Sequence, residues 1–81
     1  MDNANICGKR IKQVRESLGW QQVELAAALY IDFKIKLEQS DISEIERGVR
    51  AVKDFEVEAL SRVLSVSPIW LLRGDGESDA R

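Results

Sequence analysis

The chain has 81 residues, of which 44% are hydrophobic and 32% are charged, and its 5 Gly and 1 Pro are few. These numbers indicate one globular domain of mainly helical structure and exclude a second domain. The formal net charge is −2, there is no histidine, and Cys7 is the one cysteine, which excludes imidazole acid–base catalysis, the usual zinc sites and an internal disulfide.

The sequence offers no nucleophile–base pair, no Gly-rich phosphate loop and no metal cluster, so we expect no enzyme, no cofactor and no small-molecule ligand. It also contains no run of about eighteen apolar residues and no basic-then-apolar leader. We therefore expect neither a membrane span nor a signal peptide, and a cytoplasmic location.

Two helices are predicted in the first half of the chain. Apolar residues recur at helical spacing over residues 8–18, and Gly19 follows where a glycine ends a helix. The second helix begins near Gln21. Residues 30–37 mix apolar and charged side chains, and we interpret them as an extension of this helix that runs into a loop.

The third predicted helix covers residues 39–46 and ends at Gly48. Ile42 and Ile45 are its buried pair, and the other side chains of its outer face are polar. Residues 49–53 then form a loop.

Two further helices complete the expected core. The fourth starts after Asp54, which is a candidate N-cap. The fifth is short, with Ser67 as its N-cap, Pro68 as its first residue and Gly74 at its end.

We expect an N-terminal arm over residues 1–7, a folded domain over 8–74 and a disordered acidic tail over 75–81. Residues 6–73 hold eleven Lys and Arg against ten Asp and Glu, a net of +1. The body is therefore near neutral, and the acidity lies in the tails.

Four motifs in order resemble the phage repressor and Cro-like (XRE-type) helix-turn-helix family. They are RIKQVRESLGW (10–20), QQVELA (21–26), ISEIERG (42–48) and LSVSPIWLL (64–72). The resemblance covers residues 8–74 and implies an all-α, compact five-helix bundle of the lambda-repressor-like DNA-binding type. It also implies a sequence-specific regulator of transcription, a repressor, that binds a palindromic operator in double-stranded DNA as a homodimer.

The resemblance implies that the third helix enters the major groove and reads base edges. The positions that match the base-contacting residues of the family are Gln39, Ser40, Ser43 and Glu44, with Asp41 close by. Gln pairs with adenine and Glu accepts from cytosine, so these residue types suit the task. The alternative is a polar helix face that only meets solvent.

Phosphate contacts in this family come from the start of the second helix and from the loop after the third. The candidates here are Gln21, Gln22, Lys34, Lys36, Arg47, Arg50 and Lys53; each is alternatively an ordinary surface residue. Arg15 and Glu46 match a structural salt bridge of the family. Trp70, Leu71 and Leu72 are candidates for a dimer contact, and Trp70 as a core residue is the equal alternative.

The chain departs from the family pattern between the second and third helices, where residues 30–37 lengthen the usual tight turn. This segment extends the second helix either toward the DNA or away from it to a partner. In addition, Glu38, Asp41 and Glu44 place three acids on the presumed DNA face. They support an alternative function, a protein-interaction module of the same fold with weak or lost DNA binding, such as an antitoxin or antirepressor-like partner.

Overall fold

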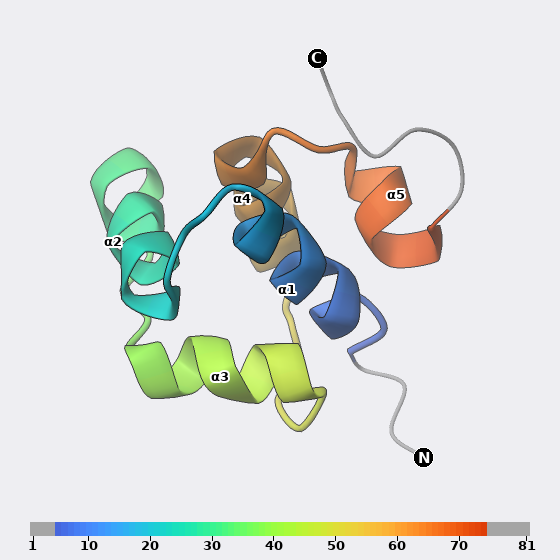
Figure 1. Cartoon of the computed structure of the whole chain (residues 1–81), viewed down its shortest axis with the longest axis horizontal. Coiled ribbons are helices and arrows are strands. Elements are labelled where there is room, and N and C mark those ends of the chain that lie inside the picture. Colours follow the sequence, from blue (N-terminus) through green and yellow to red (C-terminus); the bar gives the residue numbers. More distant parts are fainter. Residues whose placement is uncertain (1–4, 75–81) are drawn as a thin grey trace.

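The computed structural model describes residues 5–74. These residues form five α-helices and no strand (Figure 1). The helices are α1 (Gly8–Ser17), α2 (Gln22–Phe33), α3 (Gln39–Arg47), α4 (Asp54–Leu64) and α5 (Pro68–Arg73). The predicted all-α, five-helix architecture is confirmed, whereas the predicted acidic tail lies outside the described residues.

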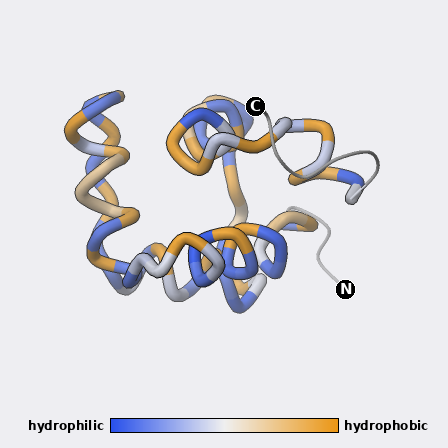
Figure 2. The backbone as a smooth tube through the Cα atoms, turned by 45° about the horizontal axis from the view of Figure 1, so that its top comes forward, coloured by the Kyte–Doolittle hydropathy of each residue, from blue (hydrophilic) through white to orange (hydrophobic). Residues whose placement is uncertain are grey.

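The core is shared by all five helices. Its fully buried side chains are Cys7, Ile11, Leu25, Leu29, Ile42, Ile45, Leu60, Leu64 and Leu71. α1 packs against α3 and α4, α2 packs against the same two helices, and α5 packs against α4. Along the helical turns, apolar residues alternate with polar ones (Figure 2), so each helix turns one side to the core. No helix within residues 5–74 is long and apolar enough to cross a membrane.

Part of the predicted N-terminal arm belongs to the packed domain. The Asn5 amide nitrogen donates to the backbone oxygens of Ile45 (2.7 Å) and Arg50 (2.9 Å), and its oxygen accepts from the Gly8 N–H at 2.9 Å. Cys7 is 1% exposed. Residues 5–7 therefore contact the packed helices.

Gly8, the first residue of α1, lies against the backbone of α3. A Cβ at this position would collide with the backbone oxygen of Ile45. Only glycine allows the two helices to pack at this distance, and the sequence gives no sign of this, because the colliding atom comes from a distant segment.

The extension of the second helix is as expected from the sequence. α2 continues to Phe33 and ends at Lys34, whose φ of 58° is left-handed. α3 begins beside the start of α2, where Gln39 and Gln22 are hydrogen-bonded. The linker over 34–38 must therefore return along the length of α2, about 18 Å, and five extended residues span about 17 Å. The extra residues thus lengthen α2 and the linker that runs back along it, and the first residue of α3 still contacts the first residue of α2.

The remaining helix ends agree with the sequence analysis at α5 and differ at α4. Ser67 caps α5 by accepting from the N–H groups of Ile69 (3.0 Å) and Trp70 (3.3 Å). At α4 the N-cap is Lys53, and the prediction of Asp54 was wrong by one residue. The carboxylate of Glu56 accepts from the Lys53 N–H at 3.0 Å, and this bond sets the start of the helix.

Candidate nucleic-acid interface

α3 lies at one edge of the molecule with one side free (Figure 1). Ile42 and Ile45 are 0% exposed and hold the helix to the core. Ser40, Glu44 and Arg47 follow one another at spacings of four and three residues, which places them on one face of the helix. Ser40 and Arg47 are exposed, whereas Ser43 and Glu44 are half-buried. We call this side of α3 the outer face.

The first turn of α3 is closed by an acidic residue. The backbone N–H of Glu38, the N-cap, donates to the Asp41 carboxylate at 2.8 Å. The other Asp41 oxygen lies 4.0 Å from the Arg50 guanidinium. Asp41 therefore stabilises the start of α3, and the nearby Arg50 guanidinium partly offsets its negative charge.

The predicted partners Arg15 and Glu46 form a buried ion pair. Arg15 Nε donates to Glu46 Oε2 at 2.6 Å and Nη2 donates to Oε1 at 3.1 Å. The two side chains are 9% and 2% exposed. Arg15 Nη1 also donates to the backbone oxygen of Trp20 at 2.7 Å. Hydrogen bonding to Glu46 raises the pKa of the Arg15 guanidinium, so the guanidinium stays charged.

Gln22 connects this ion pair to the first residue of α3. Its amide nitrogen donates to Glu46 Oε1 at 3.0 Å, and its amide oxygen accepts from Gln39 Nε2 at 3.2 Å. A chain of hydrogen bonds thus runs from the core through α2 to Gln39. It fixes the direction of the Gln39 side chain before any ligand is present.

The start of α2 retains unused hydrogen-bond donors. The Gln21 N–H donates to the Glu24 carboxylate at 2.6 Å. The N–H groups of Gln22 and Val23 have no intrahelical acceptor, and none of the hydrogen bonds within residues 5–74 uses them. Such groups suit a phosphate oxygen. Gln21 itself is exposed beside them.

Arg50, predicted as a phosphate contact, is held by groups of its own chain. Its Nη1 and Nη2 each donate to the Glu56 carboxylate at 3.1 Å, and Nη1 donates to the backbone oxygen of Ala51 at 2.9 Å. The hydrogen bonds to Glu56 raise the pKa of the Arg50 guanidinium. Because the guanidinium is held by this two-pronged ion pair, Arg50 belongs to the scaffold of the 49–53 loop.

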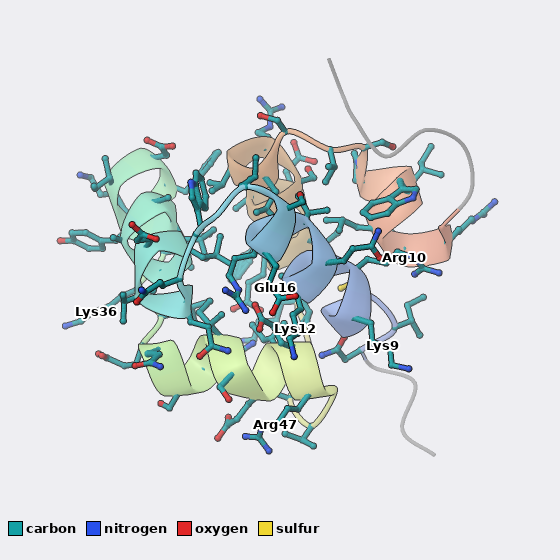
Figure 3. All side chains as sticks on the ribbon, in the orientation of Figure 1. Lys9, Arg10, Lys12, Glu16, Lys36 and Arg47 are labelled. Atoms are coloured by element: carbon teal, nitrogen blue, oxygen red, sulfur yellow. The ribbon has the colours of Figure 1, made fainter. Side chains whose placement is uncertain are left out.

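The two lysines of the linker lie at different places. Lys34 follows the end of α2 away from α3, with its Nζ 5.5 Å from the centre of the Tyr30 ring. The predicted phosphate contact of Lys34 stays a prediction. Lys36 lies near the start of α3 and projects outward (Figure 3). Lys53 is exposed, with its Nζ 5.9 Å from the centre of the Phe55 ring.

Three further cations border or occupy the α3 side of the molecule. Arg47 projects from α3, and Lys9 and Lys12 project from α1 on the side where α3 lies (Figure 3). Lys9 and Lys12 are exposed and were missed in the sequence analysis. No sequence signal separates them from ordinary surface lysines, because their position depends on the packing of α1 against α3.

The three predicted dimer residues lie on different sides of α5. Trp70 is 8% exposed and Leu71 is 0% exposed, so both complete the core of their own chain and offer no surface to a second one. For Trp70 the core alternative holds, and Leu71 is buried beside it. Leu72 is 39% exposed, and Ile69, three residues earlier on the same face, is 60% exposed.

The five helices form a bundle, and two buried isoleucines hold the polar helix α3 at its edge. This arrangement is typical of a helix-turn-helix protein. Residues 11–71 match the helix-turn-helix family, and the chain belongs to it. The predicted resemblance to phage repressor and Cro-like members is confirmed by two similar proteins.

One relative is the HTH-type transcriptional regulator DicA of Escherichia coli (strain K12), which is 37% identical over 76 residues. That match covers 93% of this chain and 52% of DicA, so the chain spans about half the length of this relative. A similar solved structure is the P22 c2 repressor in complex with a synthetic operator in the presence of Tl⁺. It superposes with a TM-score of 0.72 at 30% identity, covering 88% of this chain and 98% of the repressor chain.

Proposed function

We propose that the protein is a cytoplasmic, sequence-specific repressor that binds a palindromic operator in double-stranded DNA as a homodimer, with α3 in the major groove. The observation that carries this proposal is the hydrogen-bonded chain from Arg15 through Glu46 and Gln22 to Gln39. It holds the first side chain of an exposed helix in one direction. The likeness to a repressor bound to its operator supports the same function.

The base-reading residues in this proposal are Gln39, Ser40, Ser43 and Glu44. Gln39 has a free amide oxygen and one free N–H, the pair of groups with which a glutamine recognises adenine. Glu44 accepts from cytosine N4, and the serines donate to base-edge acceptors.

Phosphates are contacted on both sides of α3. The start of α2 provides the free N–H groups of Gln22 and Val23, with Gln21 and the second amide hydrogen of Gln22 beside them. Lys36 flanks the start of α3, and Lys53 follows the loop after it. These contacts set register and general affinity and carry no sequence information.

A selection of bound duplexes from a random pool at moderate salt tests the function directly. We expect an enriched palindrome whose half-sites lie about 34 Å apart, one turn of DNA. On that duplex, Gln39→Ala should change preference at one base pair by about 1–3 kcal/mol. Lys36→Ala should weaken binding to every duplex alike and lower the salt slope by about one.

A second candidate function is a protein-interaction module. It is favoured by Val23, Tyr30, Ile31 and Phe33 on α2, which remain 49%, 50%, 68% and 37% exposed, and by the outward carboxylate of Glu44. Under this alternative no duplex is enriched even at low salt, and that result would reject the proposed DNA binding.

A further inference from the structure

Arg47 is on the outer face of α3, together with two of the proposed base readers. It follows Ser40 by seven residues, which is about two helical turns, so the two side chains leave the helix in nearly the same direction. The separation along the helix is roughly 10 Å, or about three base-pair steps. The family resemblance instead implies a contact of Arg47 with a backbone phosphate.

The guanidinium of Arg47 is oriented by its own helix. Nε donates to the Ser43 hydroxyl at 3.3 Å, one turn earlier. No carboxylate within the described residues lies within ion-pairing distance of Arg47, although Glu44 is three residues away. The Nη1 and Nη2 groups therefore point outward with all their hydrogens free (Figure 3).

We infer that Arg47 reads a guanine in the major groove, with Nη1 and Nη2 donating to guanine O6 and N7, and that Ser43 is the residue that positions it. This inference rests on the proposed function and adds a determinant of specificity to it. A guanidinium held by Nε presents a planar pair of donors, and this pair matches O6 and N7 of guanine. A phosphate contact needs no such fixed plane.

The test is a guanine scan on the selected duplex. Each guanine is replaced in turn by 7-deazaguanine, which lacks the N7 acceptor, and dissociation constants are measured by fluorescence anisotropy. We expect the wild-type protein to lose about 10- to 100-fold in affinity at one guanine per half-site. Arg47→Ala should bind the parent and that duplex equally well. Arg47→Lys should restore the preference only in part, because an ammonium donates to guanine but lacks the planar pair of donors.

Two further variants separate position from charge. Ser43→Ala leaves the charge of Arg47 in place, and we expect it to reduce the affinity lost on 7-deazaguanine substitution at the guanine that Arg47→Ala identifies. Arg62→Ala removes the same charge from the last turn of α4, which lies on the far side of the bundle from α3 (Figure 1), and the preference should remain. Thermal unfolding by circular dichroism shows whether each variant folds.

The outcomes are distinguishable from failure of the proposed function. If the wild-type protein enriches no duplex, the DNA-binding function and this inference fail together. If it enriches an operator but Arg47→Ala weakens binding to every 7-deazaguanine duplex by the same factor as to the parent, Arg47 contacts a phosphate. The inference is then overturned, while the proposed function stands.

Discussion

Glu46 joins three helices through one carboxylate, because it belongs to α3 and accepts from Arg15 of α1 and Gln22 of α2. Every buried side-chain nitrogen and oxygen within the described residues has a partner. The removal of one member therefore leaves a buried charge alone. We expect Arg15→Ala to lower the free energy of unfolding by about 3–5 kcal/mol, measured by urea denaturation.

The control for this prediction is the exposed ion pair between Arg62 and Glu58, at 2.6 Å. Its side chains are 67% and 52% exposed, so Arg62→Ala should cost less than about 0.5 kcal/mol. If both variants lowered the free energy of unfolding equally, burial of the Arg15–Glu46 pair would add nothing to its effect on stability.

Glu56 makes stability depend on pH. Burial raises the pKa of Glu56, but the hydrogen bonds from Arg50 and from the Lys53 N–H outweigh it, and the pKa lies below its usual value of 4.5. A carboxyl whose pKa is lowered by folding stabilises the folded state above its unfolded pKa. This contribution disappears as the pH falls below 4.5 and through the folded pKa.

We therefore expect Glu56→Gln to be less stable than the wild-type protein at pH 7 and to lose less stability on acidification toward pH 3. Urea denaturation across this range measures both quantities. Glu58→Gln, which changes an exposed glutamate on the same helix, should follow the wild-type curve. Parallel curves for wild type and Glu56→Gln would contradict the prediction.

At the scale of helices, the ends with local signals were predictable. Gly19, the Ser67–Pro68 pair and Gly74 act through their own backbone or the next residues, and the structure places helix boundaries at each of them. The predicted start of α4 was wrong by one residue, because Asp54 and Glu56 are both candidates for capping this helix. Glu56, three residues after the N-cap Lys53, accepts the hydrogen bond from the Lys53 N–H. The end of α2 at Lys34 carries no typical signal, since lysine seldom adopts a left-handed conformation.

Ser65 ends α4 with φ 59° and ψ 45°, which is a left-handed conformation. A side chain costs energy there and glycine does not, although glycine loses more entropy on folding. We expect Ser65→Gly to raise the free energy of unfolding by about 0.5–1 kcal/mol in urea denaturation. Ser65→Ala keeps a Cβ and should give no gain; a gain as large as that of glycine would rule out strain as the cause.

For the molecule as a whole, the sequence predicted which helix is exposed but not how its neighbours are paired. The outer face of α3 followed from the positions of Ile42 and Ile45. The pairing of Arg50 with Glu56 depends on the path of the loop between them, which composition does not reveal. Likewise, α5 has apolar residues on all sides, so spacing alone could not show that Trp70 and Leu71 face inward and Ile69 and Leu72 outward.

Of the predicted dimer segment α5, the proposed homodimer can use only the apolar side chains that the monomer leaves exposed, Ile69 and Leu72. We expect Ile69→Glu and Leu72→Glu each to shift sedimentation equilibrium toward the monomer and to weaken operator binding, because a carboxylate would be buried in the contact. Ile31→Glu, on α2 at the opposite side of the bundle (Figure 1), is the matched control. If it dissociates the dimer and the α5 variants do not, the contact lies on α2.

The pairing of Arg50 with Glu56 has a consequence for how such a regulator would be distributed in a cell. A cation tied to its own protein adds little to phosphate neutralisation, which supplies nearly all affinity for random sequence. Under the proposed function, the rest of the chromosome then holds fewer copies than it would if Arg50 were free. Occupancy of the operator would follow the concentration of the protein closely, so a modest change in synthesis or turnover would be enough to switch the gene.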